Sequence, residues 1–175
     1  MTKLEIKLLS DNATKPKRAD DESAGYDIYA SEDVLIEPQD KTLVSTDLAV
    51  NIPKGYVGLL TSRSGVSSKT HLVVETGKID AGYQGHMKIN VKNDSPNRNL
   101  FTLFAKHVNR DISGKIIQNS NSKRKYTINN YLIKKGERLA QLVIVPIHTP
   151  ELEPVKEFGY TTERGDKGFG SSGTR

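Results

Sequence analysis

Met87-Lys88-Ile89-Asn90-Val91 decides the fold class of this chain, because apolar and polar residues alternate along it. A period of two places Met87, Ile89 and Val91 on one face of an extended strand, as in a sheet with one buried face. Runs of similar character, punctuated by Gly, Pro and Asn, recur along the sequence. They are Leu4 to Leu9, Val34 to Ile36, Thr42 to Ile52, Tyr56 to Leu60, Leu72 to Val74, His86 to Val91, Leu100 to His107, Lys125 to Ile133 and Leu139 to Ile147.

Helical periodicity is nearly absent from the sequence. No stretch keeps the apolar spacing of a helix over three turns, so we expect at most one short helical turn, near Arg63 to Lys69. Many short strands with frequent turn residues are typical of a sandwich, a barrel or a jelly roll. The sequence therefore predicts an all-β protein.

The composition narrows the classes of function. The chain has 175 residues, which predicts one domain large enough to bury a core. Its net charge of +5, from 26 basic and 21 acidic residues, suits anionic ligands without identifying them. Cysteine is absent and the four histidines lack ligand spacing, so a structural metal site is not expected. The basic cluster Lys123-Arg124-Lys125 lies in an Asn/Ser-rich stretch and predicts a solvated loop tip, so nucleic-acid binding is not expected.

Nothing in the sequence predicts targeting to a membrane. The N-terminal residues are too charged for a signal peptide, and the longest apolar run, Leu142 to Ile147, is too short to span a bilayer. We therefore expect a cytoplasmic protein.

The first of five polar blocks is Ala24-Gly25-Tyr26-Asp27-Ile28-Tyr29-Ala30. Asp27 interrupts an otherwise apolar strand, and a buried carboxylate is costly unless it is paired or lies near a metal. The alternative is an aspartate on an edge strand that faces water.

The second block is Ser62-Arg63-Ser64-Gly65, at the start of the expected helical turn. An arginine, a hydroxyl and free backbone amides at the start of a helix form an anion site. A surface turn that carries an arginine and a serine cap is the alternative.

The third block runs from Gly77 to Gly85 and is expected to form a hairpin, with Asp80 and Tyr83 at its mouth. Asp80 is a candidate general base, and Tyr83 offers a flat face to a sugar ring. An ordinary turn aspartate is the alternative.

The fourth block, Lys135 to Gln141, precedes a strongly apolar strand. Glu137 and Arg138 could pair for purely structural reasons. In a regular strand Gln141 lies on the opposite face from Arg138, three residues earlier.

The fifth block is the glycine-rich C-terminus, Arg164 to Arg175. It combines an arginine, the aromatic Phe169 and glycine amides, which are groups that bind phosphates and bases. A frayed terminus is the alternative. A Walker loop is excluded, because Ser171 stands where that motif needs lysine.

The ordered set of AGYD, RSG, GKIDAGYQG, KGERLAQL and RGDKGFGSSG resembles the five motifs of the trimeric deoxyuridine triphosphatase (dUTPase) family, from about residue 3 to residue 173. The resemblance implies a jelly-roll fold of the dUTPase β-clip type and a homotrimer with exchange of C-terminal arms. It also implies magnesium-dependent hydrolysis of dUTP to dUMP and diphosphate, with each active site built from three subunits.

The resemblance further implies roles for individual residues. Asp80 would deprotonate the attacking water and bind the 3′-hydroxyl, and Tyr83 would exclude a 2′-hydroxyl. Asp27 and Gln141 would complete the catalytic set by ordering the water shell of Mg²⁺, an ion held mainly by the substrate phosphates. The remaining substrate-binding residues would be Arg63, Ser64, Gly65, Lys78, Ile79, Lys88, Arg164, Phe169, Gly170, Ser171 and Ser172.

One segment departs from the usual family pattern. Residues 1–160 would form the core, with an inserted segment at about 95–130, and residues 161–175 would form a flexible arm that closes over an active site. The insert resembles that of dUTPases encoded by staphylococcal phages, a subset that also binds a pathogenicity-island repressor. Apolar Leu100, Phe101 and Phe104 would suit such a partner, or would anchor the insert to the core. If the protein is phage-encoded, its location would be the host cytoplasm.

A dCTP deaminase of the same fold is the alternative enzyme. Gly65 after Ser64 and the complete glycine-rich tail favour cleavage of dUTP. A regulatory protein triggered by nucleotide is the alternative from another class, and it could coexist with catalysis.

Overall fold

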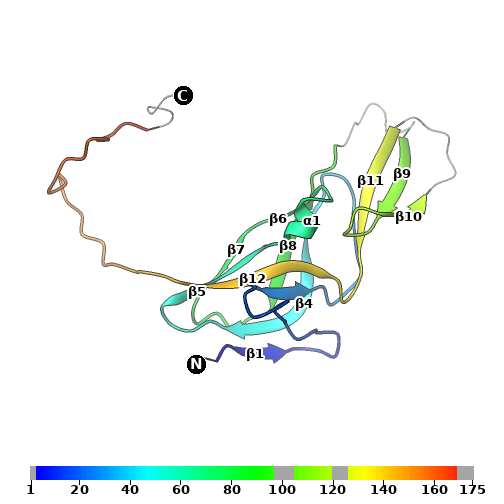
Figure 1. Cartoon of the computed structure of the whole chain (residues 1–175), viewed down its shortest axis with the longest axis horizontal. Coiled ribbons are helices and arrows are strands. Elements are labelled where there is room, and N and C mark those ends of the chain that lie inside the picture. Colours follow the sequence, from blue (N-terminus) through cyan, green and yellow to red (C-terminus); the bar gives the residue numbers. More distant parts are fainter. Residues whose placement is uncertain (1–2, 97–104, 120–125, 169–175) are drawn as a thin grey trace.

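The structure, a computed structural model, describes residues 3–96, 105–119 and 126–168. This part of the chain is almost entirely strand, with one helical turn (Figure 1). The strands are β1 (Glu5–Leu8), β2 (Tyr26–Tyr29), β3 (Val34–Ile36), β4 (Lys41–Asn51), β5 (Tyr56–Ser62), β6 (Leu72–Val74), β7 (Gly77–Ile79), β8 (Met87–Asn93), β9 (Ala105–Arg110), β10 (Ile116–Asn119), β11 (Tyr126–Ile133) and β12 (Arg138–Pro146), and the helical turn is α1 (Ser64–Ser67).

The strands form three sheets of four strands each. Their orders are β1-β4-β8-β6, β2-β12-β5-β7 and β10-β9-β11-β3. Nearly all pairs are antiparallel, and β9 with β11 is the parallel exception. The all-β class expected from the sequence is confirmed.

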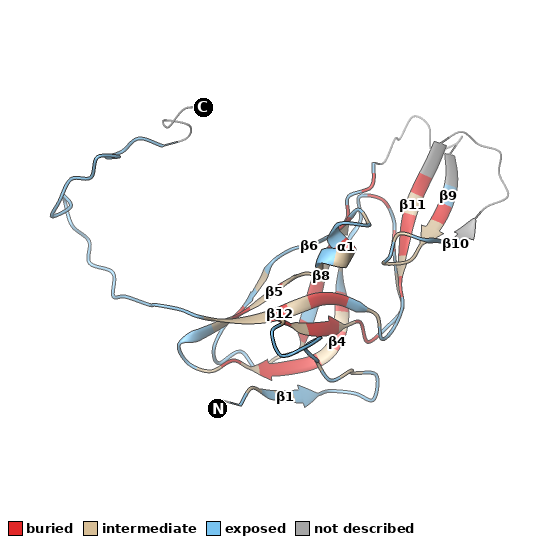
Figure 2. Ribbon diagram, viewed as in Figure 1, coloured by how far each residue is buried: buried red, intermediate tan, exposed pale blue. Residues whose placement is uncertain are grey.

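The alternating stretch that predicted the fold class forms β8, in the interior of the first sheet. Met87, Ile89 and Val91 are buried, whereas Lys88 is exposed. They belong to one continuous core with residues of β2, β4, β5, β11 and β12 (Figure 2). The period of two was therefore a correct guide to the buried face.

The expected hairpin between Gly77 and Gly85 is wrong in one respect. β7 pairs with β5, whereas β8 pairs with β4 and β6 in a different sheet. The segment between β7 and β8 therefore crosses from one sheet to another and does not join two paired strands. Periodicity identifies strands but carries no information on which strands pair, so the sequence could not reveal this crossing.

The third sheet contains the described part of the expected insert. β10, which was not expected from the sequence, pairs antiparallel with β9. The turn between them lies close to the loop after α1: a Cβ added to Gly114 would lie within contact distance of the Lys69 carbonyl oxygen. Gly114 also has a φ of +81°. Leu100, Phe101 and Phe104 lie outside the described residues.

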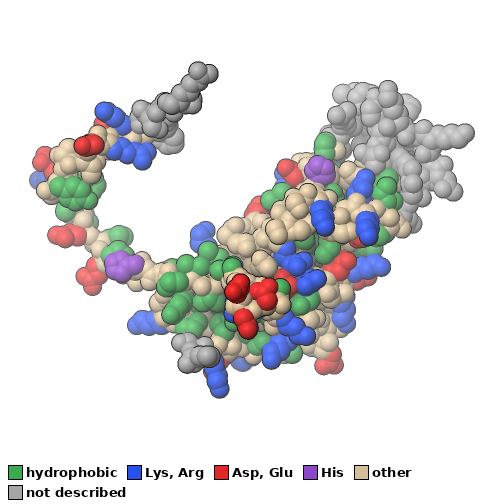
Figure 3. Space-filling view, viewed as in Figure 1, with side chains coloured by type: hydrophobic (Ala, Val, Ile, Leu, Met, Phe, Trp, Pro, Cys, Tyr) green, Lys and Arg blue, Asp and Glu red, His purple; other side chains and the backbone are tan. Residues whose placement is uncertain are grey.

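The C-terminal segment leaves the body of the molecule after Pro146. Residues 147–168 run away from the sheets as an exposed strand-free stretch (Figure 1). Figure 3 shows hydrophobic side chains on this segment, and Leu152 and Phe158 are 93% and 87% exposed. No helix in the described ranges is long and apolar enough to cross a membrane.

Candidate active site

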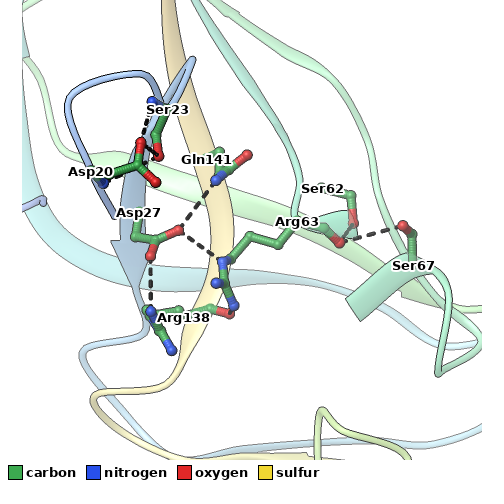
Figure 4. Close-up of polar contacts among 8 residues, drawn as sticks. All are labelled: Asp20, Ser23, Asp27, Ser62, Arg63, Ser67, Arg138 and Gln141. Atoms are coloured by element: carbon green, nitrogen blue, oxygen red, sulfur yellow. Dashed lines mark hydrogen bonds and ion pairs between the residues drawn. The ribbon is translucent and has the colours of Figure 1, made fainter. Parts of the chain in front are cut away.

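Asp27 is a buried carboxylate at the centre of a polar cluster (Figure 4). Its Oδ1 accepts hydrogen bonds from Arg63 Nε at 2.8 Å and from Gln141 Nε2 at 3.4 Å, and its Oδ2 accepts one from Arg138 Nη1 at 3.2 Å. Such partners offset the cost of burying a charge. The sequence alternative of an aspartate facing water is therefore wrong, although β2 is an edge strand.

A β-bulge in β12 brings Arg138 and Gln141 to the same carboxylate. Arg138 is opposite Tyr29 and Ala140 is opposite Ile28, so β12 contains one more residue than β2 across this step. The extra residue, Leu139, is buried next to buried Ala140. The opposite faces expected for Arg138 and Gln141 in a regular strand therefore do not apply, because the strand is not regular here.

The partner of Arg138 was also not expected. Its guanidinium contacts Asp27, whereas the carboxylate of Glu137 accepts the backbone N–H of Lys134 at 2.9 Å. In the sequence, the position of Glu137 and Arg138 directly before an apolar strand suggested that these two side chains pair with each other. That interpretation was wrong, because each side chain has a different partner.

Arg63 links the cluster to the helical turn. It follows β5 and precedes α1, and its carbonyl accepts the N–H groups of Val66 and Ser67. Its guanidinium also reaches the Arg138 carbonyl at 3.3 Å. One carboxylate against two guanidinium groups leaves the Asp27 cluster with a net charge of +1. The side chain of Arg138 is 51% exposed, so this positive charge is accessible to an anionic ligand.

Ser64 and Gly65 lie beside the cluster, in the first residues of α1. Ser64 is exposed. Apart from the chain neighbours of Gly65 and the backbone of α1, no atom of the described residues lies within 4 Å of a Cβ added to Gly65. Neither packing nor a positive φ within the described chain requires glycine at this position. The lack of a side chain at Gly65 leaves its backbone open to a ligand.

The crossing segment between β7 and β8 carries the candidate base. Asp80 is exposed, and its carbonyl accepts the N–H of Tyr83 at 3.1 Å. The Tyr83 ring lies across Gly85, where an added Cβ would be 2.6 Å from the tyrosine oxygen. Lys78 and Lys88 have exposed side chains on either side of this segment, whereas Ile79 belongs to the core and could contribute only its backbone.

A single chain does not bring Asp80 to the Asp27 cluster. Gly58 of β5 is opposite Ile79, the residue before Asp80, whereas Arg63 follows the other end of β5. Five residues of extended chain separate Gly58 from Arg63, a span of roughly 16 Å. Arg63 also points across β12 toward β2, away from β7 (Figure 4). The candidate base and the candidate phosphate-binding arginine therefore lie at opposite ends of one sheet.

Arg164 is the candidate binding residue of the fifth block that lies within the described residues. It lies on the exposed C-terminal segment, where its Nε donates to the carbonyl of Lys167 at 3.0 Å. This segment extends away from the Asp27 cluster of its own chain (Figure 1). Phe169, Gly170, Ser171 and Ser172 lie outside the described residues.

The polar cluster does not form a protein cage for a metal. Among the described residues, no group of three or more His, Asp or Glu side chains could hold a cation. Asp27 is the carboxylate of this cluster, and two guanidinium groups already neutralise it. Mg²⁺ often binds through substrate phosphates and keeps several waters, and this cluster is compatible only with that mode.

The sequence matches the dUTPase family over residues 11–106 and 104–173. The chain belongs to the dUTPase family. A curated relative, the deoxyuridine 5′-triphosphate nucleotidohydrolase of Paramecium bursaria Chlorella virus 1, is 34% identical over 173 residues, which cover 99% of each chain.

Two solved dUTPase structures extend this comparison. The dUTPase of Staphylococcus bacteriophage 80alpha with dUPNHPP is 55% identical to this chain, with a TM-score of 0.88, and the match covers 99% of both chains. That structure belongs to work in which phage dUTPases control transfer of virulence genes. The second structure is a point mutant of the dUTPase of Staphylococcus aureus phage phi11, and it reveals the coordination of a structural Mg(II) ion in that protein. It is 53% identical to this chain, with a TM-score of 0.80, and the match covers 91% of this chain and all of the phi11 chain.

Proposed function

We infer that the chain is a dUTP diphosphatase, which hydrolyses dUTP to dUMP and diphosphate. The observation that carries this inference is the near-complete match to a dUTPase that binds a dUTP analogue. The dUTPase family membership favours this reaction over deamination of dCTP. The net positive Asp27 cluster supports the inference, because a triphosphate is the most highly charged part of the substrate.

Asp80 is the proposed general base. Its exposed carboxylate would orient a water for attack on the α-phosphorus, take its proton and bind the 3′-hydroxyl. A positioned base of this kind typically contributes about 10²- to 10⁴-fold to the rate. The half-exposed ring of Tyr83 would pack against the deoxyribose and leave no room for a 2′-hydroxyl. Backbone groups around Lys78, Ile79 and Lys88 would bind the uracil edge.

Arg63, Ser64 and Gly65 are the proposed phosphate-binding residues. The Arg63 guanidinium is held in place by Asp27, so it need not be ordered when the substrate binds. Mg²⁺, bound mainly by the phosphates, would neutralise charge on their oxygens. Asp27 and Gln141 would contact its water shell without direct ligation.

The proposed assembly is a homotrimer. The separation of Asp80 from Arg63 along one sheet supports it, because a second chain could supply the missing half of each site. The exposed segment 147–168 supports exchange of arms, with Arg164, Phe169, Gly170, Ser171 and Ser172 closing over a site formed by other subunits. In this proposal residues 1–160 form the core with its insert, and residues 161–175 form the arm.

A second, regulatory role is proposed for the insert at about 95–130. The relation to a phage dUTPase that controls transfer of virulence genes supports it, and binding to a pathogenicity-island repressor is the proposed means. Deleting residues 96–130 should abolish binding of that repressor while hydrolysis of dUTP persists. Undiminished binding by a folded deletion variant would contradict the role of the insert.

Release of diphosphate from dUTP, dCTP, dTTP and UTP, measured in parallel with and without Mg²⁺, tests the proposed reaction. Cleavage confined to dUTP is expected, and ammonia release from dCTP would instead favour the deaminase. The Asp80→Asn variant should lose turnover while it still binds dUPNHPP. Equal turnover of UTP would contradict the proposed role of Tyr83.

A further inference from the structure

The segment that carries Tyr83 ends against an irregularity in β4. Ser45 of β4 is opposite Lys88, but the next paired residues are Leu48 and Met87, so Thr46 and Asp47 bulge out of the ladder. Asp47 has a φ of +51°, in the left-handed region that few residues other than glycine adopt. Its carbonyl accepts the N–H of Leu9 at 2.8 Å, and its carboxylate accepts the hydroxyl of Ser10.

His86 binds this bulge with a defined ring nitrogen. The backbone N–H of Asp47 donates to His86 Nε2 at 3.0 Å, and Asp47 Oδ1 lies 3.4 Å from the same nitrogen. A nitrogen that accepts an N–H group carries no proton, so the neutral ring must carry its proton on Nδ1. The contact therefore exists only in the neutral form of His86.

The backbone of His86 is also the anchor of the Tyr83 ring. The Tyr83 hydroxyl donates to the His86 carbonyl at 3.1 Å, across Gly85. A second contact, from Gln84 Nε2 to Asn51 Oδ1 at 3.3 Å, ties the same segment to β4. The position of the tyrosine ring thus depends on β4 through His86 and Gln84.

We propose that His86 is a positioning residue, which fixes the Tyr83 ring for the deoxyribose of dUTP by binding the β4 bulge in its neutral form. The proposal rests on the dUTPase activity inferred above. It adds a determinant of KM and sugar selectivity that lies outside the five sequence blocks that suggested the family.

Two substitutions test the hydrogen bond. His86→Gln keeps an oxygen that can accept the Asp47 N–H, whereas His86→Leu removes the acceptor. His148→Gln, at an exposed position of the C-terminal segment, is the matched control. KM and kcat for dUTP are measured at pH 8 for the wild-type protein and for the three variants.

At pH 8 we expect His86→Leu to raise KM for dUTP about two- to tenfold, the range that follows from one lost hydrogen bond, with kcat little changed. Its preference for dUTP over UTP should fall by a similar factor. The KM of His86→Gln should stay close to the wild-type value, because its side-chain oxygen can accept the same N–H. A wild-type KM in His86→Leu, or a KM in His86→Gln as high as in His86→Leu, would overturn the proposal.

The ring nitrogens of His86 supply a readout that needs no turnover. Nitrogen NMR of the nucleotide-free wild-type protein should show the proton on Nδ1 at pH 8, with Nε2 accepting the hydrogen bond of the Asp47 amide. A proton on Nε2 at pH 8 would refute the geometry even if dUTP is hydrolysed. Failure of the wild-type protein to hydrolyse dUTP would refute the proposed activity and leave the NMR result intact. If His86→Leu does not fold, His86→Gln and the NMR measurement decide.

Discussion

Arg63 Nε lies 2.8 Å from Asp27 Oδ1, although the two residues are 36 positions apart in the chain. The pair joins β2 to the residue that precedes α1, across β12. Its carboxylate is buried, whereas the Arg63 side chain is 25% exposed. The pair thus holds a partly accessible cation in a fixed place.

Substitution Arg63→Ala should weaken both the fold and the activity. The buried Asp27 loses its shortest partner, so unfolding in urea should require about 1.5 to 3 kcal/mol less free energy, the range for a hydrogen bond to a charged group. The loss of one phosphate-binding group should lower kcat/KM by about 10²- to 10³-fold. The double variant with Asp27→Asn should be less destabilised than the sum of the single variants, because neither partner is then left alone. Additive costs would mean that the pair does not stabilise the protein.

Substitution Gly65→Ala should separate binding from folding. Because the added Cβ meets no atom of the described residues beyond its chain neighbours and the backbone of α1, the free energy of unfolding should change by less than about 0.5 kcal/mol. The KM for dUTP should rise if phosphate approaches the open backbone, as proposed. Ser68→Ala, in the same exposed turn, controls for a change of helical propensity. Unchanged KM in Gly65→Ala would remove Gly65 from the proposed site.

Two inactive variants should restore activity when they are mixed. Asp80→Asn chains supply an intact Arg63, and Arg63→Ala chains supply an intact Asp80. If each site takes these residues from different chains, random trimers of an equal mixture should contain intact pairs at about a quarter of the sites. Unfolding and refolding the mixture, followed by a diphosphate assay, measures this. No recovery in correctly refolded trimers would indicate that one chain supplies both residues.

Asp111 should make the turn between β9 and β10 sensitive to acid. Burial raises the pKa of Asp111, but hydrogen bonds from Ser113 and from the backbone of Lys115 outweigh it and hold the pKa below its usual 3.8. The folded state therefore favours the carboxylate, and its stabilising effect is full above pH 3.8 and is lost as pH falls through the lowered value. Asp111→Asn should lower the urea midpoint at pH 7 and show less further loss near pH 2.5.

The matching substitution Asp166→Asn, on the exposed C-terminal segment, controls for the change in net charge. All midpoints are compared at one protein concentration, because assembly contributes to stability. An Asp111→Asn protein with the wild-type response to acid would contradict the assignment.

The sequence predicted the strands of this protein better than their partners. Alternation in Met87 to Val91 and the β-branched runs depend on local contacts with a buried face, so they can be read along one chain. The crossing between β7 and β8 depends on which sheet each strand joins, and this is decided by packing between distant segments. Strand β10 was missed because its four residues show no clear alternation.

The candidate site was predictable as a set of residues but not as a geometry. The blocks around Asp27, Arg63 and Gln141 do meet in the fold. The contact of Arg138 with Asp27 depends on the β-bulge at Leu139, and the sequence pattern does not indicate this bulge. The sequence does not distinguish His86 from the other three scattered histidines, because its partner Asp47 is 39 positions away.

Because of the bulge at Leu139, the contact between Arg138 and Asp27 depends on the number of residues in β12 as well as on their types. An insertion of one residue between Arg138 and Gln141, with the bulge kept, would turn Arg138 to the far side of the sheet, away from Asp27. Substitution of Leu139 by another aliphatic residue would keep both contacts. Natural variants and engineered libraries of this enzyme should therefore tolerate exchanges at residue 139 far better than insertions beside it.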